Sequence, residues 1–188
     1  MKKIICILVV GLLSNCINQN NITDYEIETI SLFKQQEKQE DEKNIYLIAQ
    51  LITCETAQKF TNEKIKASKE IRFEMQDIIT VVLNRVDCEK HFKKQTTIEE
   101  VIFAKNQFEP VSRGIIYNTI PTEEAIRITT INYYKWKEEG KTYSNLPKNA
   151  LFFAHHKIKP SKVCKGLKEV QSERYYNNRG LHKFYNIN

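Results

Sequence analysis

The segment that decides the fold reads IYLIAQLITCETAQ at residues 45–58. Its apolar side chains fall on most faces of a helix, so it predicts a buried helix. Glu55 is its one acidic residue, and it shares a face with Leu51 and Ile52 one turn earlier. A carboxylate in apolar surroundings is costly to ionise, which raises its pKa as a general acid requires. The structural alternative is a glutamate at a helix end whose side chain reaches solvent.

The chain that follows predicts an α+β fold, predominantly helical with a small β-sheet. Residues 59–72 are polar and lysine-rich, which is typical of a surface loop. FEMQDIITVVLNRV (73–86) predicts a second buried helix, although its β-branched run would also suit a strand. TIEEVIFA (97–104) predicts a short helix with Thr97 and Glu100 as a capping box, and residues 122–139 predict an amphipathic helix between Thr122 and Gly140. ALFFAHH (150–156) and HKFYNI (182–187) are strand-like.

The first residues predict export. MKKIICILVVGLLSNC (1–16) has two lysines before a short apolar run, which is the layout of a secretory signal and is too short to span a bilayer. Its end, LSNC, resembles the bacterial lipobox, with Cys16 as the residue to be lipidated. The alternative is an ordinary signal cleaved elsewhere. We therefore expect a signal peptide at 1–15, a polar tether at 16–44 with a marginal helix in it, and one domain at 45–188. The expected location is the bacterial cell envelope, anchored to the membrane by lipid and facing the periplasm or cell wall.

Charge and cysteine content limit the partners. The net charge is +6, and seven acidic residues against three lysines in 16–44 leave the excess of positive charge on the domain. Such a domain suits a polyanionic partner, although a lysine-rich solubilising surface explains the charge equally well. Cys54, Cys88 and Cys164 permit at most one disulfide, and no spacing is typical of zinc ligands. We expect no cofactor, no metal and no nucleic-acid partner, because the motifs of nucleic-acid modules are missing from the sequence.

Five short motifs in order resemble the SleB/CwlJ-type cell wall hydrolases. They are CETA (54–57), VVLNRV (81–86), NQFEPV (106–111), NALFFAHH (149–156) and GLHKFY (180–185). The resemblance implies a lysozyme-like fold related to goose-type lysozymes and lytic transglycosylases. It also implies peptidoglycan as the partner, cut between N-acetylmuramic acid and N-acetylglucosamine. Cys54 in place of the usual glycine, the longer basic loop at 59–72, and Glu109-Pro110 depart from the family pattern.

The resemblance also implies roles for individual residues. Glu55 would protonate the leaving glycosidic oxygen and then accept the proton of the muramic acid 6-hydroxyl, giving a 1,6-anhydro product. Hydrolysis would need a second carboxylate, for which Glu74 and Glu109 are the candidates. Four further residues are candidates for sugar binding, with core packing as the alternative for the aromatic ones: Gln107, Phe108, Phe153 and Tyr185.

Two further expectations complete the sequence-based prediction. Asn84 and Arg85 are expected to hydrogen-bond within the fold rather than to act on substrate. His155, His156 and His182 invite a metal interpretation, but adjacent histidines on a strand point to opposite faces. The competing function is an inactive lipoprotein on the same scaffold that binds the cell wall or a partner protein.

Overall fold

The computed structural model describes residues 24–56, 69–88, 90–92, 94–155, 167–170 and 182–186. The signal segment with Cys16, most of the basic loop, His156 and Cys164 lie outside these residues. Residues Met1–Asp41 and Glu42–Asn188 form two compact units, and each is described by itself. No helix in the described ranges has an apolar stretch long enough to cross a bilayer.

The described part of the first unit is the beginning of α2 (Asp24–Thr56). The helix expected here is present, and it continues past Asn44 without a break. The polar segment and the buried segment of the sequence therefore belong to one helix. Ile30, Leu32 and Phe33 are exposed on its first half.

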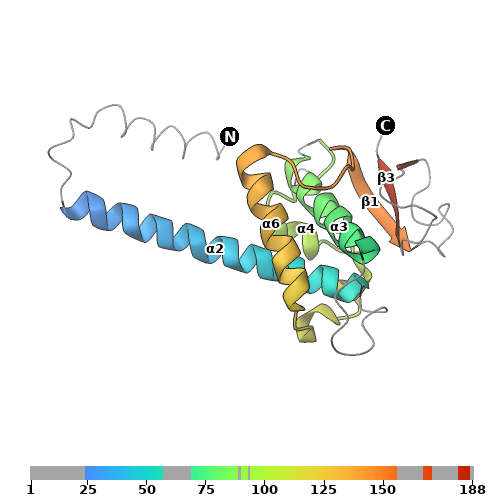
Figure 1. The fold of residues 1–188 in the computed structure, drawn as a ribbon, viewed down its shortest axis with the longest axis horizontal. Coiled ribbons are helices and arrows are strands. Elements are labelled where there is room, and N and C mark those ends of the chain that lie inside the picture. Colours follow the sequence, from blue (N-terminus) through green and yellow to red (C-terminus); the bar gives the residue numbers. More distant parts are fainter. Residues whose placement is uncertain are drawn as a thin grey trace. The chain divides into compact units, whose positions relative to one another are not determined.

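Five further helical segments belong to the second unit (Figure 1). They are α3 (Lys69–Asp87), α4 (Ile98–Ile102), α5 (Glu109–Ser112), η2 (Ile116–Asn118) and α6 (Glu123–Glu139). The strand alternative for residues 78–83 is wrong, because α3 is helical throughout and apolar on most sides. The loop expected to reach Arg72 ends earlier, since α3 begins at Lys69. The short α5 and η2 were not predicted.

The predicted helix caps are confirmed. The Thr97 side chain accepts a hydrogen bond from the Glu100 backbone, and the Glu100 carboxylate accepts from the Thr97 backbone. Thr122 caps the first turn of α6 by accepting from the Ala125 backbone. Gly140 ends α6 in the left-handed conformation, with φ of 65°, which glycine adopts at little cost.

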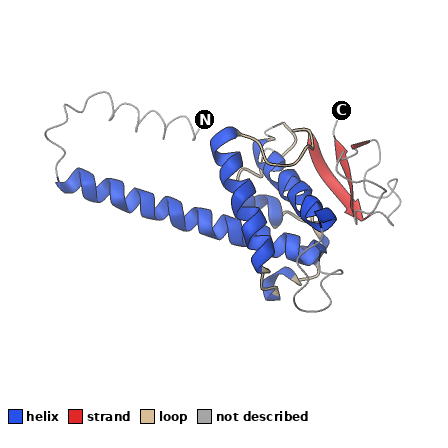
Figure 2. Ribbon diagram, viewed as in Figure 1, coloured by secondary structure: helices blue, strands red, loops and turns tan. Residues whose placement is uncertain are grey.

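A three-stranded antiparallel sheet lies beside the helices (Figure 2). Its strands are β1 (Ala150–His155), β2 (Lys168–Val170) and β3 (His182–Asn186), in the order β1-β3-β2. The register pairs His155 with His182 and Phe153 with Phe184, and a bulge lies between Ala150 and Phe152. The edge strand β1 and the central strand β3 match the sequence prediction, and the edge strand β2 was not predicted.

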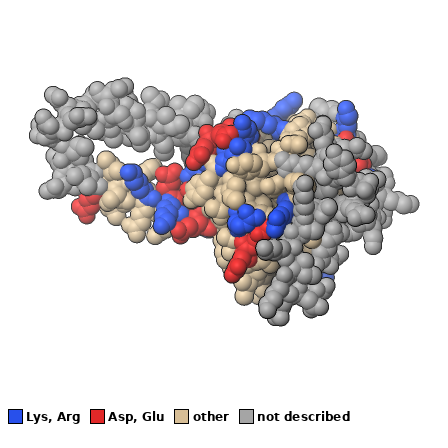
Figure 3. Space-filling view, viewed as in Figure 1, with Lys and Arg blue, Asp and Glu red and all other residues tan. Residues whose placement is uncertain are grey.

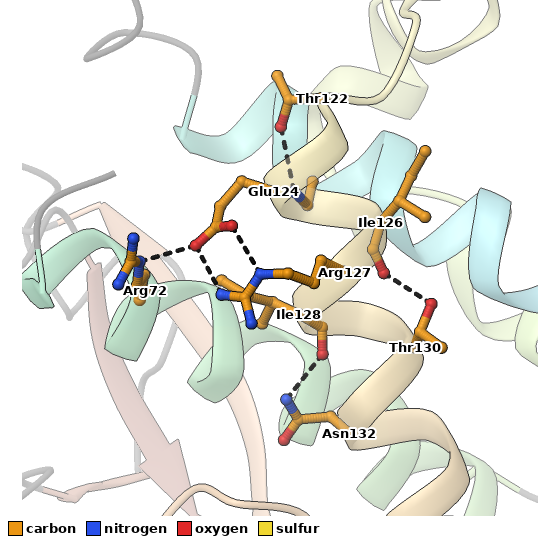
Figure 4. Close-up of polar contacts among 9 residues, drawn as sticks. Arg72, Thr122, Glu124, Ile126, Arg127, Ile128, Thr130 and Asn132 are labelled. Carbon is orange, nitrogen blue, oxygen red and sulfur yellow. Dashed lines mark hydrogen bonds and ion pairs between the residues drawn. The ribbon is translucent and has the colours of Figure 1, made fainter. Parts of the chain in front are cut away.

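The core forms where α3 packs against α4, α6 and β1. Its fully buried residues include Ile48 and Leu51 of α2 and Met75, Ile79 and Leu83 of α3. At one end of the interface between α3 and α6, the Glu124 carboxylate bonds to Arg72 at 2.7 Å and to Arg127 at 2.8 Å (Figure 4). On the face drawn in Figure 3, acidic and basic side chains of the described residues are interspersed.

Candidate active site

Three elements of the second unit bring two carboxylates to one histidine. Glu55 lies in the last turn of α2, Glu74 in the second turn of α3, and His182 begins β3. His182 Nδ1 lies 2.7 Å from Glu74 Oε1, and His182 Nε2 lies 3.4 Å from Glu55 Oε2. The imidazole therefore stands between the two glutamates with one ring nitrogen toward each. We call these three residues the Glu–His–Glu cluster.

Packing explains why the cluster is held in place. The turns of α2 before Glu55 are buried through Ile48, Leu51 and Ile52, so the end of this helix is anchored in the core. The rings of His182 and Phe153 of β1 meet edge to face, with centroids 5.1 Å apart and planes at 85°. Glu74 and His182 are buried, whereas the Glu55 side chain is 13% exposed. Glu55 is thus the member of the cluster that solvent or a ligand can reach.

The electrostatics of the cluster favour a charged histidine. Burial by itself would lower the pKa of His182, because it removes the imidazolium from water. The hydrogen bonds to Glu55 and Glu74 and the charges of both glutamates outweigh burial, and the pKa rises from 6.5 to about 9. At neutral pH the ring therefore carries a proton on both nitrogens and donates to both carboxylates.

This arrangement can hold and move a proton. A carboxylate hydrogen-bonded to imidazolium lies next to a proton donor, and the proton can pass between Nε2 and Oε2. The second carboxylate fixes the ring orientation and stabilises the positive charge, as a carboxylate does in other catalytic clusters. Among the described residues no group of histidine, cysteine and acidic side chains is placed to hold a metal ion.

The two candidates for a second carboxylate have different surroundings. Glu74 is buried and bonded to His182. Glu109 is exposed at the start of α5, where its carboxylate accepts a hydrogen bond from Arg113 at 3.2 Å. The structure therefore brings Glu74, and not Glu109, into contact with the cluster.

The residues predicted to bind sugar lie mostly in the packing around the cluster. Phe108 and Tyr185 are buried, and Phe153 is half-buried, with its ring centroid 5.8 Å from that of Phe108. Gln107 is half-buried in the turn before α5, where its backbone N–H donates to the Ala104 carbonyl. In this conformation the aromatic rings mainly support His182 and β1.

Side chains of α2 bind the connection between α5 and α6. Gln50 Nε2 donates to the carbonyl oxygens of Ile116 and Thr119, and Thr53 Oγ1 accepts from the Thr122 backbone. The Cys54 thiol donates to Thr119 Oγ1 at 3.1 Å. Burial raises the pKa of this thiol, and the negative charge of Glu55 raises it further. The hydrogen bond to Thr119 lowers the pKa by less than these two effects raise it. Cys54 is therefore a neutral donor that joins the end of α2, next to Glu55, to this connection.

Asn84 and Arg85 attach β1 to α3. Asn84 Nδ2 donates to the carbonyl oxygens of Pro147 and Ala150, each at 3.1 Å. Arg85 Nε donates to the Leu151 carbonyl at 2.6 Å, and the guanidinium lies 5.0 Å from the Phe108 ring centroid. Burial lowers the pKa of Arg85 to about 10. Both side chains hold the sheet against the helix that carries Glu74.

His182 is the site residue whose role sequence reasoning missed, since it was considered only as a metal ligand. Its signal was the HKFY motif, in which alternate residues of a strand share a face. His182 and Phe184 therefore point to the same side, and Phe184 is an apolar residue of the core. A histidine on the core side of a strand needs a polar partner, and the buried Glu74 provides it.

Comparison with known proteins gives the family. The model of a family described as Cell Wall Hydrolase matches residues 69–185. The match covers more than half of the chain and includes Glu74 and His182, whereas Glu55 precedes it. No curated protein and no solved structure matches the chain. The resemblance to SleB/CwlJ-type enzymes is confirmed, and the chain belongs to the cell wall hydrolase family, whose substrate is peptidoglycan.

Proposed function

We propose that this cell wall hydrolase cuts peptidoglycan glycan strands as a lytic transglycosylase, between N-acetylmuramic acid and N-acetylglucosamine. The observation that carries the proposal is the placement of Glu55 beside His182, whose other nitrogen bonds to the buried Glu74. Glu55 is the general acid and then the base. His182 and Glu74 are positioning residues, which orient the Glu55 carboxylate and supply its proton.

The proton balance of the reaction closes within the cluster. A proton passes from His182 Nε2 to Glu55, and Glu55 gives it to the glycosidic oxygen as the bond from that oxygen to the anomeric carbon breaks. The muramic acid 6-hydroxyl then attacks the anomeric carbon and forms the 1,6-anhydro ring. Its proton goes to Glu55 and from there back to His182 Nε2, which restores the starting state. No water is consumed, so no second carboxylate is needed to activate one.

The surroundings of the other two carboxylates support transglycosylation over hydrolysis. A base that activates water must contact that water beside the sugar. Glu74 is enclosed and bonded to His182, which leaves its carboxylate little access to a water next to the substrate. Glu109 is on the surface with Arg113. Neither is placed as a hydrolytic base.

The fold and the location form part of the same proposal. The second unit is mostly helical, has a small antiparallel sheet, and carries Glu55 at the end of a helix. These features support a lysozyme-like fold. The export signal and the lipidated Cys16 expected from the sequence would hold the enzyme on the envelope side where its substrate lies.

Mass spectrometry of the products tests the mechanism. Purified peptidoglycan is incubated with the wild-type protein, Glu55→Gln, and Glu109→Gln as a matched control. We expect anhydro-muropeptides from wild type and Glu109→Gln, and a rate lower by about a hundredfold or more from Glu55→Gln. Products with free reducing ends would contradict transglycosylation. Cleavage by Glu55→Gln at the wild-type rate would contradict the role of Glu55, and binding without cleavage would favour the inactive scaffold.

A further inference from the structure

The connection between α5 and α6 exposes three large apolar side chains within six residues. We call residues 115–120 the Tyr117 loop. Ile115 is 42% exposed, Tyr117 68% and Ile120 83%. Single exposed apolar residues are common on protein surfaces, but a cluster on one short connection is typical of a binding surface.

The Tyr117 loop is held in one conformation. The Tyr117 ring stacks on the Phe103 ring, with centroids 5.7 Å apart and planes at 15°, and Phe103 packs against the core. The backbone forms the 3-10 turn η2, and Gln50 binds two of its carbonyl oxygens. One face of the Tyr117 ring is therefore covered by Phe103, and the ring is fixed before any ligand arrives. A surface ordered in advance loses less entropy on binding.

The same loop is joined to the end of α2 that carries Glu55. Thr119 Oγ1 accepts the hydrogen bond of Cys54, the residue that directly precedes Glu55, and donates to the Ile115 carbonyl. Ile120 follows Thr119 in the chain. The loop is thus hydrogen-bonded to the residue that precedes Glu55.

We propose that Tyr117 and Ile120 bind sugar rings of the glycan strand outside the linkage that is cut. The C–H faces of pyranose rings are apolar and pack on aromatic rings, and the N-acetyl methyl groups of this polymer suit an aliphatic side chain. The occupant is the glycan strand because the loop is bonded to Cys54, next to Glu55 in the chain, and because the family acts on peptidoglycan. This inference rests on the proposed function for its substrate, but it concerns binding and not cleavage.

Sedimentation with insoluble peptidoglycan tests the inference in the full-length Glu55→Gln protein, which separates binding from cleavage. Tyr117→Ala and Ile120→Ser are each added to this background. Tyr117→Phe keeps the stacking ring. Tyr143→Ala is the matched control, since Tyr143 is 45% exposed and lies under Lys135. We expect Tyr117→Ala to weaken binding about fivefold to tenfold, while Tyr117→Phe and Tyr143→Ala bind as the parent does.

The outcomes separate the two proposals. Unchanged binding by both Tyr117→Ala and Ile120→Ser, in protein whose circular dichroism matches the parent, would overturn the inference. Competition with glycan chains stripped of their peptides should displace the protein; if only peptide-bearing fragments compete, the loop binds stem peptides or a protein partner and the inference is wrong. If wild type cuts nothing but the Tyr117-dependent binding persists, the proposed function fails and the inference stands.

Discussion

Replacing Glu74 by glutamine should change the protonation of His182 and the pH dependence of stability. The substitution keeps the shape of the side chain and removes one of the two charges that face the imidazole. In the variant, burial still disfavours the charged ring, and only one carboxylate remains to stabilise it. We expect the pKa of His182 to fall below its wild-type value of about 9 in Glu74→Gln, because one of the two carboxylates that raise it is lost.

In the wild type, the contribution of His182 protonation to stability follows from the linkage between proton binding and folding. The pKa of His182 is about 9 in the folded state, against 6.5 without the fold. At about 1.4 kcal/mol for each tenfold change, the bound proton contributes about 3 kcal/mol to the free energy of unfolding. Because the folded pKa is raised, this stability is complete below pH 6.5 and is lost as the pH rises through 9. In Glu74→Gln the loss should be smaller and should end at a lower pH, because the folded-state pKa is lower.

Two measurements check the prediction. Nuclear magnetic resonance of the imidazole nitrogens gives the titration midpoint, with His182→Asn to assign the signal among the four histidines. Urea denaturation at pH 6, 8 and 9.5 gives the stability. Glu109→Gln is the control, since it makes the same chemical change at an exposed site. A wild-type midpoint at 6.5, or equal midpoints in wild type and Glu74→Gln, would refute the reasoning.

Three further predictions concern the frame around the site. Asn84→Leu should lower the free energy of unfolding by about 2 kcal/mol, because two backbone carbonyl groups lose their donor; urea denaturation measures this, and unchanged stability would contradict the structural role. Trp136→Phe should lower the free energy of unfolding by about 1–3 kcal/mol, because the 2.7 Å hydrogen bond from the indole N–H to the Asp87 carboxylate is lost. Asp87→Asn keeps an acceptor and loses only its charge, so it should cost less; thermal melting by circular dichroism compares the two variants. Thr97→Ala should cost about 1 kcal/mol while Thr97→Ser costs little, because serine keeps the cap, and equal losses would show that the hydroxyl is not what matters.

The helices and strands were largely predictable because their signals are local. Thr97, Thr122 and Gly140 begin or end helices through contacts within a few residues, so the sequence pattern suffices. The continuity of α2 past Asn44 was not predicted, since a change from polar to apolar composition does not require a break in a helix. The strand β2 has three residues and two exposed side chains, so it has no alternating pattern to detect.

The site was predictable only in part because it depends on contacts between distant segments. Glu55 stood out by its apolar neighbours, and Glu74 was a candidate only as the second carboxylate of a hydrolytic reaction. The bridging position of His182 depends on how β3 pairs with β1 and packs near α3, which local pattern does not specify. The Tyr117 loop contains no periodic pattern, and its hydrogen bonds to Gln50 and Cys54 appear only in three dimensions.

The order of the three cluster residues along the chain has a consequence for biosynthesis. His182 lies 108 residues after Glu74 and belongs to the last described strand. Contacts between such distant residues carry a large entropic cost of loop closure and form slowly. A growing polypeptide therefore contains both glutamates long before their histidine is made. The Glu–His–Glu cluster is therefore incomplete during synthesis, and it forms only when β3 has been made and has joined the sheet.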